Sequence, residues 1–283
     1  MRTSESPLIM QLLQEMQYRN YSPRTVKTYH SLLTKMEREL PVSLDRATVE
    51  DLKVHLHHRI MNEKISVSMV NQYISVFKIL QVDLLKRKWE PVIIKRPRRE
   101  KKLPVVLSQS EVEKLIKATS NTKHKAILML AYSSGLRRQE IKLIKPSAID
   151  SARMQVHVVQ GKGKKDRYTI LSTKTLQLLR FYYKYERPLT YLFEPTGHKG
   201  QHLADETLNC IVKKSAAKAG IKKRVSFHTL RHCFATHLLE QGVNLRLIQE
   251  FLGHVSIKTT SVYLHLANID PAGIISPLDT MNL

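Results

Sequence analysis

Apolar residues recur at three- and four-residue spacing along most of the chain, the pattern of amphipathic helices. Within the first ninety residues this pattern predicts helices at about 8–18, 23–39, 49–62 and 67–87. A start signal precedes each of them: Ser6-Pro7, Ser22-Pro23, Thr48, and Ser66 or Ser68. The sequence therefore predicts a four-helix N-terminal domain over residues 1–90.

Residues 91–104 lack a helical period and are rich in proline, which predicts an extended linker. The second domain, 105–283, opens with a capping box from Ser108 to Glu111 and a helix to about residue 118. Further helices are predicted at 124–134, 137–144, 173–185 and 205–219. Alternating segments at 155–159 and 167–171 predict a β-hairpin around a Gly- and Lys-rich turn. The expected fold is mainly α, with one small β-sheet in the second domain.

The segment 228–263 combines helical periodicity with side chains that can bind phosphate. Its first helix carries His228 and Arg231 on one face. A second, short helix ends just before His254, which then lies in the turn past a helix end. Tyr263 follows about two and a half turns later, at ~3.6 residues per turn, on a Thr-rich third helix. The segment predicts a phosphate-handling site.

The charge balance points to a polyanionic partner. The chain has 283 residues, 47 Lys and Arg against 24 Asp and Glu, and a formal net charge of +23, so nucleic acid is the leading candidate. No apolar run approaches the ~18 residues needed to cross a bilayer and no signal-peptide core is evident, so we expect a cytoplasmic protein without a membrane partner. Cys210 and Cys233 lack metal-type pairing and are expected to be buried small apolar residues in a reducing compartment.

Two linked motifs carry a family resemblance. The residues H-x-L-R-H-x-F-A-T-H-L-L-E-x-G from position 228, then L-G-H-x-S-I-x-T-T-x-x-Y-x-H, resemble the signature of the tyrosine recombinases, or integrase family, in the compact Xer-like form. The pattern of this family also includes an Arg after a Gly-Leu pair and a Lys in a Gly-Lys-Gly hairpin. Both are present, as Arg137 and Lys162. It implies six catalytic residues: Arg137, Lys162, His228, Arg231, His254 and the nucleophile Tyr263.

The chemistry of phosphodiester transfer gives these residues distinct tasks. Arg137 and Arg231 would hold the non-bridging oxygens, because a guanidinium donates bidentately and stays charged; His254 would add a further donor. Tyr263 would attack to form a 3′-phosphotyrosine, which requires neighbouring cations to favour its phenolate. Because the new ester conserves the energy of the old one, strands can be rejoined without ATP. The resemblance also implies that no metal or other cofactor is needed.

The remaining assignments leave alternatives open. Lys162 would protonate the leaving 5′ oxygen, with Lys164 as the next candidate. His228 would accept the proton of the tyrosine or hold the phosphate. Since the Gly-Leu-Arg motif is followed by Arg138, either of the paired arginines could point inward, and the register favours Arg137.

A zinc site is the rival interpretation of the histidine-rich helix. Its four candidate ligands, at steps of four, one and four residues, are His228, His232, Cys233 and His237. Structural zinc is bound by well-spaced ligand pairs from separate elements, so we favour the recombinase. In the resemblance His232 and His237 are structural. Three further histidines are expected to face solvent: His55, His57 and His58.

The resemblance also implies partners. It makes residues 1–90 a SAM-like core-binding domain that closes with the catalytic domain as a clamp on double-stranded DNA, and it implies a homotetramer on two paired recombination sites. The candidates for DNA contact are basic residues of the first domain, the linker and the hairpin: Arg24, Lys27, Arg96, Arg98, Arg99 and Lys164. The apolar tail 269–283 would dock on a neighbouring protomer or form a disordered end. The alternatives are a type IB topoisomerase-like nicking-closing enzyme and a catalytically idle DNA-binding regulator.

Overall fold

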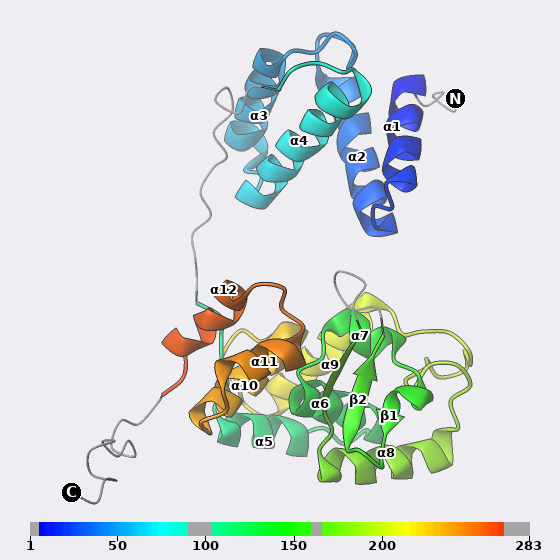
Figure 1. Cartoon of the computed structure of the whole chain (residues 1–283), viewed down its shortest axis with the longest axis vertical. Helices are drawn as coiled ribbons and strands as arrows, with labels where there is room; N and C mark the ends of the chain where they lie inside the picture. The colour runs from blue at the N-terminus through cyan, green and yellow to red at the C-terminus, as the bar shows by residue number, and fades with distance from the viewer. Residues whose placement is uncertain (1–5, 90–102, 160–165, 269–283) are drawn as a thin grey trace, which may run out of the picture. The chain divides into compact units, whose positions relative to one another are not determined.

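The chain forms two compact units, Met1–Lys101 and Lys102–Leu283. The computed structural model describes residues 6–89, 103–159 and 166–268 of them (Figure 1). Each unit has its own hydrophobic core. Within these residues, no helix combines the length and the apolar composition needed to cross a membrane.

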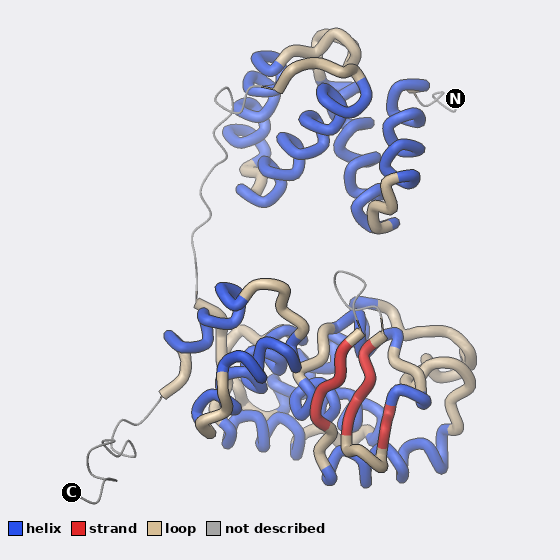
Figure 2. The backbone as a smooth tube through the Cα atoms, in the orientation of Figure 1, coloured by secondary structure: helices blue, strands red, loops and turns tan. Residues whose placement is uncertain are grey.

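The first unit contains the predicted helices, drawn in blue in Figure 2. They are α1 (Pro7–Tyr18), α2 (Pro23–Glu39), α3 (Val49–Glu63) and α4 (Val67–Ile79). The last was predicted to continue as an α-helix to residue 87, but it changes at Leu80–Leu84 into a π-helical turn, η1. Ser66, rather than Ser68, is the N-cap of α4, because its hydroxyl accepts from the Met69 N–H at 3.2 Å.

His55 corrects one prediction about the first unit. His57 and His58 are exposed, as expected, whereas His55 is only 7% exposed. Its ring lies edge-on to Tyr73, with ring centroids 5.6 Å apart. On a helix, positions three and four apart share a face, so His55 turns inward with Leu52.

The second unit is also mainly helical. Its α-helices are α5 (Gln109–Lys117), α6 (Thr122–Ser134), α7 (Arg138–Leu143), α8 (Thr173–Glu186), α9 (Asp205–Lys218), α10 (Phe227–Glu240), α11 (Leu245–Leu252) and α12 (Ile257–Thr260). Among the described residues, two short 3₁₀ helices accompany them: η2 (Pro146–Ala148) follows α7, and η3 (Ser261–His265) follows α12. The capping box of α5 is present: the Ser108 hydroxyl accepts from the Glu111 N–H, and the Glu111 carboxylate accepts from the Ser108 N–H.

The predicted hairpin is part of a three-stranded antiparallel sheet, drawn in red in Figure 2. Its strands, in order, are β1 (Ile149–Asp150), β2 (Gln155–Val158) and β3 (Arg167–Ile170). Val156 pairs with Thr169, and both side chains are buried on the core face. β1 was not predicted, since two residues are too few for an alternating pattern.

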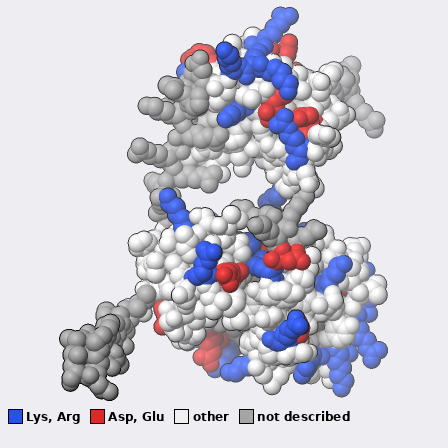
Figure 3. All heavy atoms as spheres, in the orientation of Figure 1, with Lys and Arg blue, Asp and Glu red and all other residues white. Residues whose placement is uncertain are grey.

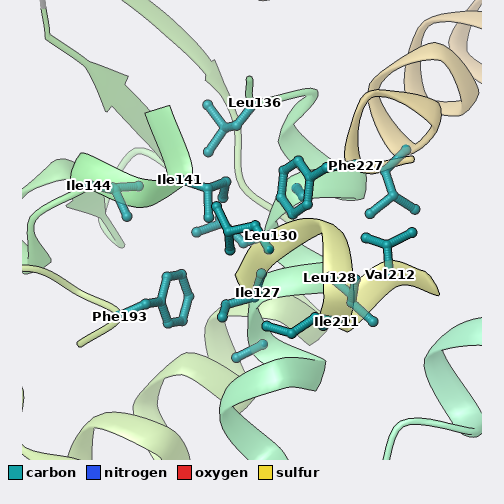
Figure 4. Close-up of a cluster of buried hydrophobic side chains, with 14 of the residues drawn as sticks. Ile127, Leu128, Leu130, Leu136, Ile141, Ile144, Phe193, Ile211, Val212 and Phe227 are labelled. Atoms are coloured by element: carbon teal, nitrogen blue, oxygen red, sulfur yellow. The ribbon is translucent and has the colours of Figure 1, made fainter. Parts of the chain in front are cut away.

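The core of the second unit surrounds α6, which packs against α8 and α10. Figure 4 shows side chains from several helices converging there, among them Ile127, Leu130, Ile141 and Phe227. A smaller apolar cluster joins α10, α11 and η3, with Phe234, Leu252 and Tyr263 among its members. Figure 1 shows α10, α11 and α12 grouped on one side of this unit. The segment 228–263 therefore begins within this core, through Leu230 and Cys233 of α10.

The two cysteines differ from each other. Cys233 is buried, as predicted, and its sulfur accepts a hydrogen bond from the Leu107 N–H at 3.2 Å. Cys210 is exposed, so its predicted burial was wrong. It lies on α9 between the buried residues Leu208 and Ile211, on the side of the helix that faces solvent.

Candidate active site

A pocket of about 460 Å³ opens where α10, the end of α11 and η3 meet the segment between α6 and α7. Its lining includes Arg137, His228, Arg231, His254 and Tyr263. The structure thus brings together five of the six residues that the sequence singled out. The sixth, Lys162, lies outside the described residues.

Arg231 is the most enclosed cation of this pocket. It is 2% exposed, and its Nη1 donates to the Gly135 carbonyl at 2.7 Å. Its Nη2 donates to the Leu252 carbonyl and, at 3.0 Å, to Nε2 of His254. Burial, aided by the charge of Arg137, lowers the pKa of Arg231 to about 9. The guanidinium therefore remains charged near neutral pH.

Arg137 is held by the buried carboxylate of Glu140. Its Nη1 donates to Glu140 Oε1 at 2.8 Å and its Nη2 to the Gly253 carbonyl at 3.0 Å. Arg167 of β3 binds the same carboxylate bidentately, at 2.8 and 2.7 Å. Burial favours the neutral acid, but Arg167 and then Arg137 outweigh it and lower the pKa of Glu140 to about 2. The carboxylate is thus a charged bridge between the two arginines.

The second of the paired arginines lies elsewhere. Arg138 Nη2 donates to Asp205 Oδ2 at 3.1 Å, and Lys142 binds the same carboxylate at 3.0 Å. Of the two arginines, Arg137 lines the pocket, and Arg138 pairs with Asp205 at the start of α9.

His254 follows Gly253, which ends α11 in the left-handed conformation with φ +61°. Because a guanidinium can only donate, Nε2 of His254 must accept from Arg231. Nδ1–H then donates to the Thr260 hydroxyl at 2.9 Å. Burial, followed by the charges of Arg231 and Arg137, lowers the pKa of His254 to about 3. In this state the imidazole is neutral and accepts from Arg231.

Tyr263 lies on η3, after the short α12, rather than on one continuous third helix. It is 3% exposed, and its hydroxyl is 3.1 Å from Nδ1 of His232. Burial raises the pKa of Tyr263 above its ordinary value, although Arg231 and Arg137 act in the opposite direction. The cations expected to favour a phenolate are present, but in this state burial outweighs them.

His228 and His232 lie one turn apart on α10. Their rings meet edge to face, with centroids 5.8 Å apart. Desolvation of the His228 ring, followed by the charge of Arg231, lowers the pKa of His228. The pKa of His232 falls to about 4, through burial, His228 and Arg231. The family resemblance makes His232 structural, whereas the structure places its ring against the Tyr263 hydroxyl. The i, i+4 spacing from His228, which puts both rings on one face of α10, is the signal in the sequence.

The other histidine of this helix has a structural position. His237 Nε2 donates to the Leu107 carbonyl at 2.9 Å, which leaves Nδ1 to accept from the Tyr132 hydroxyl at 2.9 Å. The backbone N–H of Leu107 in turn donates to the sulfur of Cys233. In the part of the chain that the structure describes, no three His, Cys, Asp or Glu side chains gather as metal ligands would.

The structure describes only two of the six candidates for DNA contact. Arg24 and Lys27 are exposed on α2. On the face drawn in Figure 3, Lys and Arg side chains are spread over both units. The other candidates lie outside the described residues: Arg96, Arg98, Arg99 and Lys164.

Comparisons with known proteins agree with this architecture. Residues 105–269 match the phage integrase family and residues 8–91 its N-terminal SAM-like domain. A tyrosine recombinase of Thermosipho africanus is 34% identical over 88% of this chain and 91% of its own length. The crystal structure of XerA recombinase is 28% identical, with a TM-score of 0.55 over 92% of this chain and 94% of that one.

A third comparison concerns the fold alone. A lambda integrase tetramer bound to a Holliday junction is 18% identical, with a TM-score of 0.72 over 95% of this chain and 78% of that one. The chain belongs to the phage integrase family. It is a tyrosine recombinase, an enzyme of site-specific DNA recombination.

Proposed function

We propose that the pocket of about 460 Å³ holds the scissile phosphate of duplex DNA and that Tyr263 is the nucleophile. One observation carries this proposal: two arginines, three histidines and a tyrosine, from segments about ninety residues apart in the sequence, line a single pocket. Such a set binds a phosphate anion and places a hydroxyl beside it. Arg137 and Arg231 donate to the non-bridging oxygens, where they stabilise the charge of the transition state.

The cleavage step conserves the number of phosphoesters. The Tyr263 oxygen bonds to phosphorus, the bond to the 5′ oxygen breaks, and the DNA remains joined to the enzyme as a 3′-phosphotyrosine. Lys162 supplies the proton that the leaving 5′ oxygen needs. A 5′-hydroxyl from the partner strand reverses the step and rejoins DNA without ATP.

A bound phosphate would change the protonation of His254. Arg231, Arg137 and burial now hold the pKa of His254 near 3. A phosphate in the pocket adds negative charge beside these groups, which raises the pKa of nearby histidines. His254 can then release the hydrogen bond from Arg231 and donate to the phosphate itself.

The partner is double-stranded DNA, and we propose that four protomers act on two paired sites in the cytoplasm. The net charge of +23 supports a polyanionic partner. The lambda integrase that shares this fold was solved as a tetramer on a Holliday junction. Arg24 and Lys27 are exposed on α2, where they can contact the phosphate backbone.

Neighbouring arginines provide the test. Arg137→Lys, which removes the planar guanidinium from the pocket, should slow strand cleavage by about 10²- to 10³-fold, the usual effect of losing one transition-state donor. Arg138→Lys keeps a cation opposite Asp205 and should change the rate by less than about threefold. The measurement is single-turnover cleavage of a duplex carrying the recombination site, with gel-shift affinity as the binding control. Equal losses in the two variants would contradict the proposed site.

A further inference from the structure

The hydroxyl of Tyr263 contacts one imidazole, that of His232, with 3.1 Å between Oη and Nδ1. The two rings are tilted by 49°, with centroids 5.8 Å apart. Tyr263 is 3% exposed and is packed into the cluster of α10, α11 and η3. The contact therefore joins two side chains whose positions are fixed by the fold.

The direction of this hydrogen bond follows from the chemistry of the two groups. Both are neutral, because burial raises the pKa of Tyr263 and lowers that of His232 to about 4. A phenol is a far stronger acid than a neutral imidazole N–H, so the Tyr263 O–H donates and Nδ1 accepts. The proton that must leave before attack already points at His232.

We infer that His232, rather than His228, accepts the proton of Tyr263 during cleavage. This inference rests on the proposed function. As Oη bonds to phosphorus, the phenolic proton moves to Nδ1 and His232 becomes an imidazolium; during rejoining it returns the proton to the departing tyrosine. His228, which meets His232 edge to face and lines the pocket, is left to bind the phosphate.

The groups that surround His232 explain why it accepts only when DNA is bound. His228 and Arg231 lie beside it on α10, His254 faces it from the turn after α11, and Tyr263 faces it from η3. The charge of Arg231 and the burial of the His232 ring disfavour a protonated His232. The doubly charged transition state places negative charge in the same pocket and favours the protonated ring. The proton is thus transferred with bond formation, and free phenolate does not accumulate.

The test separates acceptance of the proton from positioning of the hydroxyl. His232→Asn places an amide near the position of Nδ1, which can hold the hydroxyl but cannot take its proton. We expect covalent linkage to slow by 10²- to 10³-fold, within the usual range for loss of a general base. Linkage is measured between pH 5 and 9 on nicked duplexes, with gel-shift affinity and melting temperature as folding controls. His202→Asn, at an exposed histidine, is the matched control.

A sulfur-substituted substrate distinguishes the base from the acid. A 5′-bridging sulfur leaves as a thiolate and needs no proton, because thiols are much stronger acids than alcohols. It should restore cleavage to Lys162→Ala and leave the defect of His232→Asn unchanged. Added imidazole should restore His232→Ala in part, and this second variant keeps the test independent of how Asn packs.

The outcomes separate this inference from the proposed function. If wild type forms no covalent link with DNA that it binds, the proposed function fails. If wild type forms the link and His232→Asn matches it within about threefold, with the same pH profile, only the role of His232 is overturned. Rescue of His232→Asn by the sulfur substrate, or no rescue of His232→Ala by imidazole, would also overturn it.

Discussion

At the scale of single residues, the pocket depends on a carboxylate that does not line it. Glu140 binds Arg137 on one side and Arg167 on the other, and its side chain is 9% exposed. Removing either cation would leave a buried carboxylate less compensated, which is destabilising. Arg167 also donates to the Phe251 carbonyl at 2.8 Å, so this network ties β3 to α11.

Glu140→Gln should destabilise the protein and reveal the pH dependence of this network. A shift of the pKa of Glu140 from 4.5 to about 2 corresponds to about 3 kcal/mol of stability. Because the folded-state pKa is depressed, this contribution is complete above about pH 4.5 and is lost as the pH falls toward 2. Urea unfolding of both proteins should show a difference that is constant at neutral pH and shrinks below about pH 4.5. A difference that grows in acid would contradict the bridge.

The residues of the pocket were predictable to the extent that motifs carried them. Arg137, Arg231 and Tyr263 each follow a recognisable neighbour in the sequence, so their positions could be found without coordinates. The partner of Tyr263 could not be found in this way. Its contact with His232 joins α10 to η3 and depends on how two helical segments pack, which periodicity alone does not specify.

At the scale of elements, helix ends set the geometry of the pocket. The carbonyls of Gly135, Leu252 and Gly253, at the ends of α6 and α11, accept from Arg231 or Arg137. Carbonyls at a helix C-terminus lack partners within the helix and carry partial negative charge. The two pocket arginines are thus held by the C-terminal ends of helices.

Two glycines provide a matched test of this role. Gly242 and Gly253 follow α10 and α11 with φ of +80° and +61°, so alanine is strained at both. A Cβ at Gly242 would meet nothing within 4 Å, whereas one at Gly253 would lie 2.7 Å from Cδ of Arg167. We expect Gly242→Ala to lower the free energy of unfolding by about 1 kcal/mol. Gly253→Ala should lower it by about 1 to 3 kcal/mol more and should also slow strand cleavage. Denaturant unfolding and single-turnover cleavage measure both effects, and equal losses would exclude the contact with Arg167.

The elements that sequence reasoning missed are those in which local signals are weak. The capping boxes and apolar periods gave most helices to within a few residues, because both signals lie within the element itself. The π-helical turn of η1 and the two-residue strand β1 depend on tertiary packing. The break between α12 and η3 is of the same kind, and it sets the position of Tyr263.

At the scale of the whole molecule, the described lining of the pocket belongs to the second unit. Its described lining comes from the end of the linker, the segment between α6 and α7, α10, and the stretch from α11 to η3. The formal charge of +23 belongs to the chain as a whole, with basic side chains in both units. Charge alone predicts a polyanionic partner, and the proposed site adds the chemistry that would act on it.

Covalent trapping tests the central claim most directly. Wild type and Tyr263→Phe are incubated with nicked duplexes that carry the recombination site, so that the cleaved end diffuses away and the linked form accumulates. We predict a DNA-linked band on denaturing gels for wild type and none for Tyr263→Phe, with equal gel-shift binding. A linked band of equal strength in Tyr263→Phe would contradict the account, since the nucleophile would then lie outside this pocket.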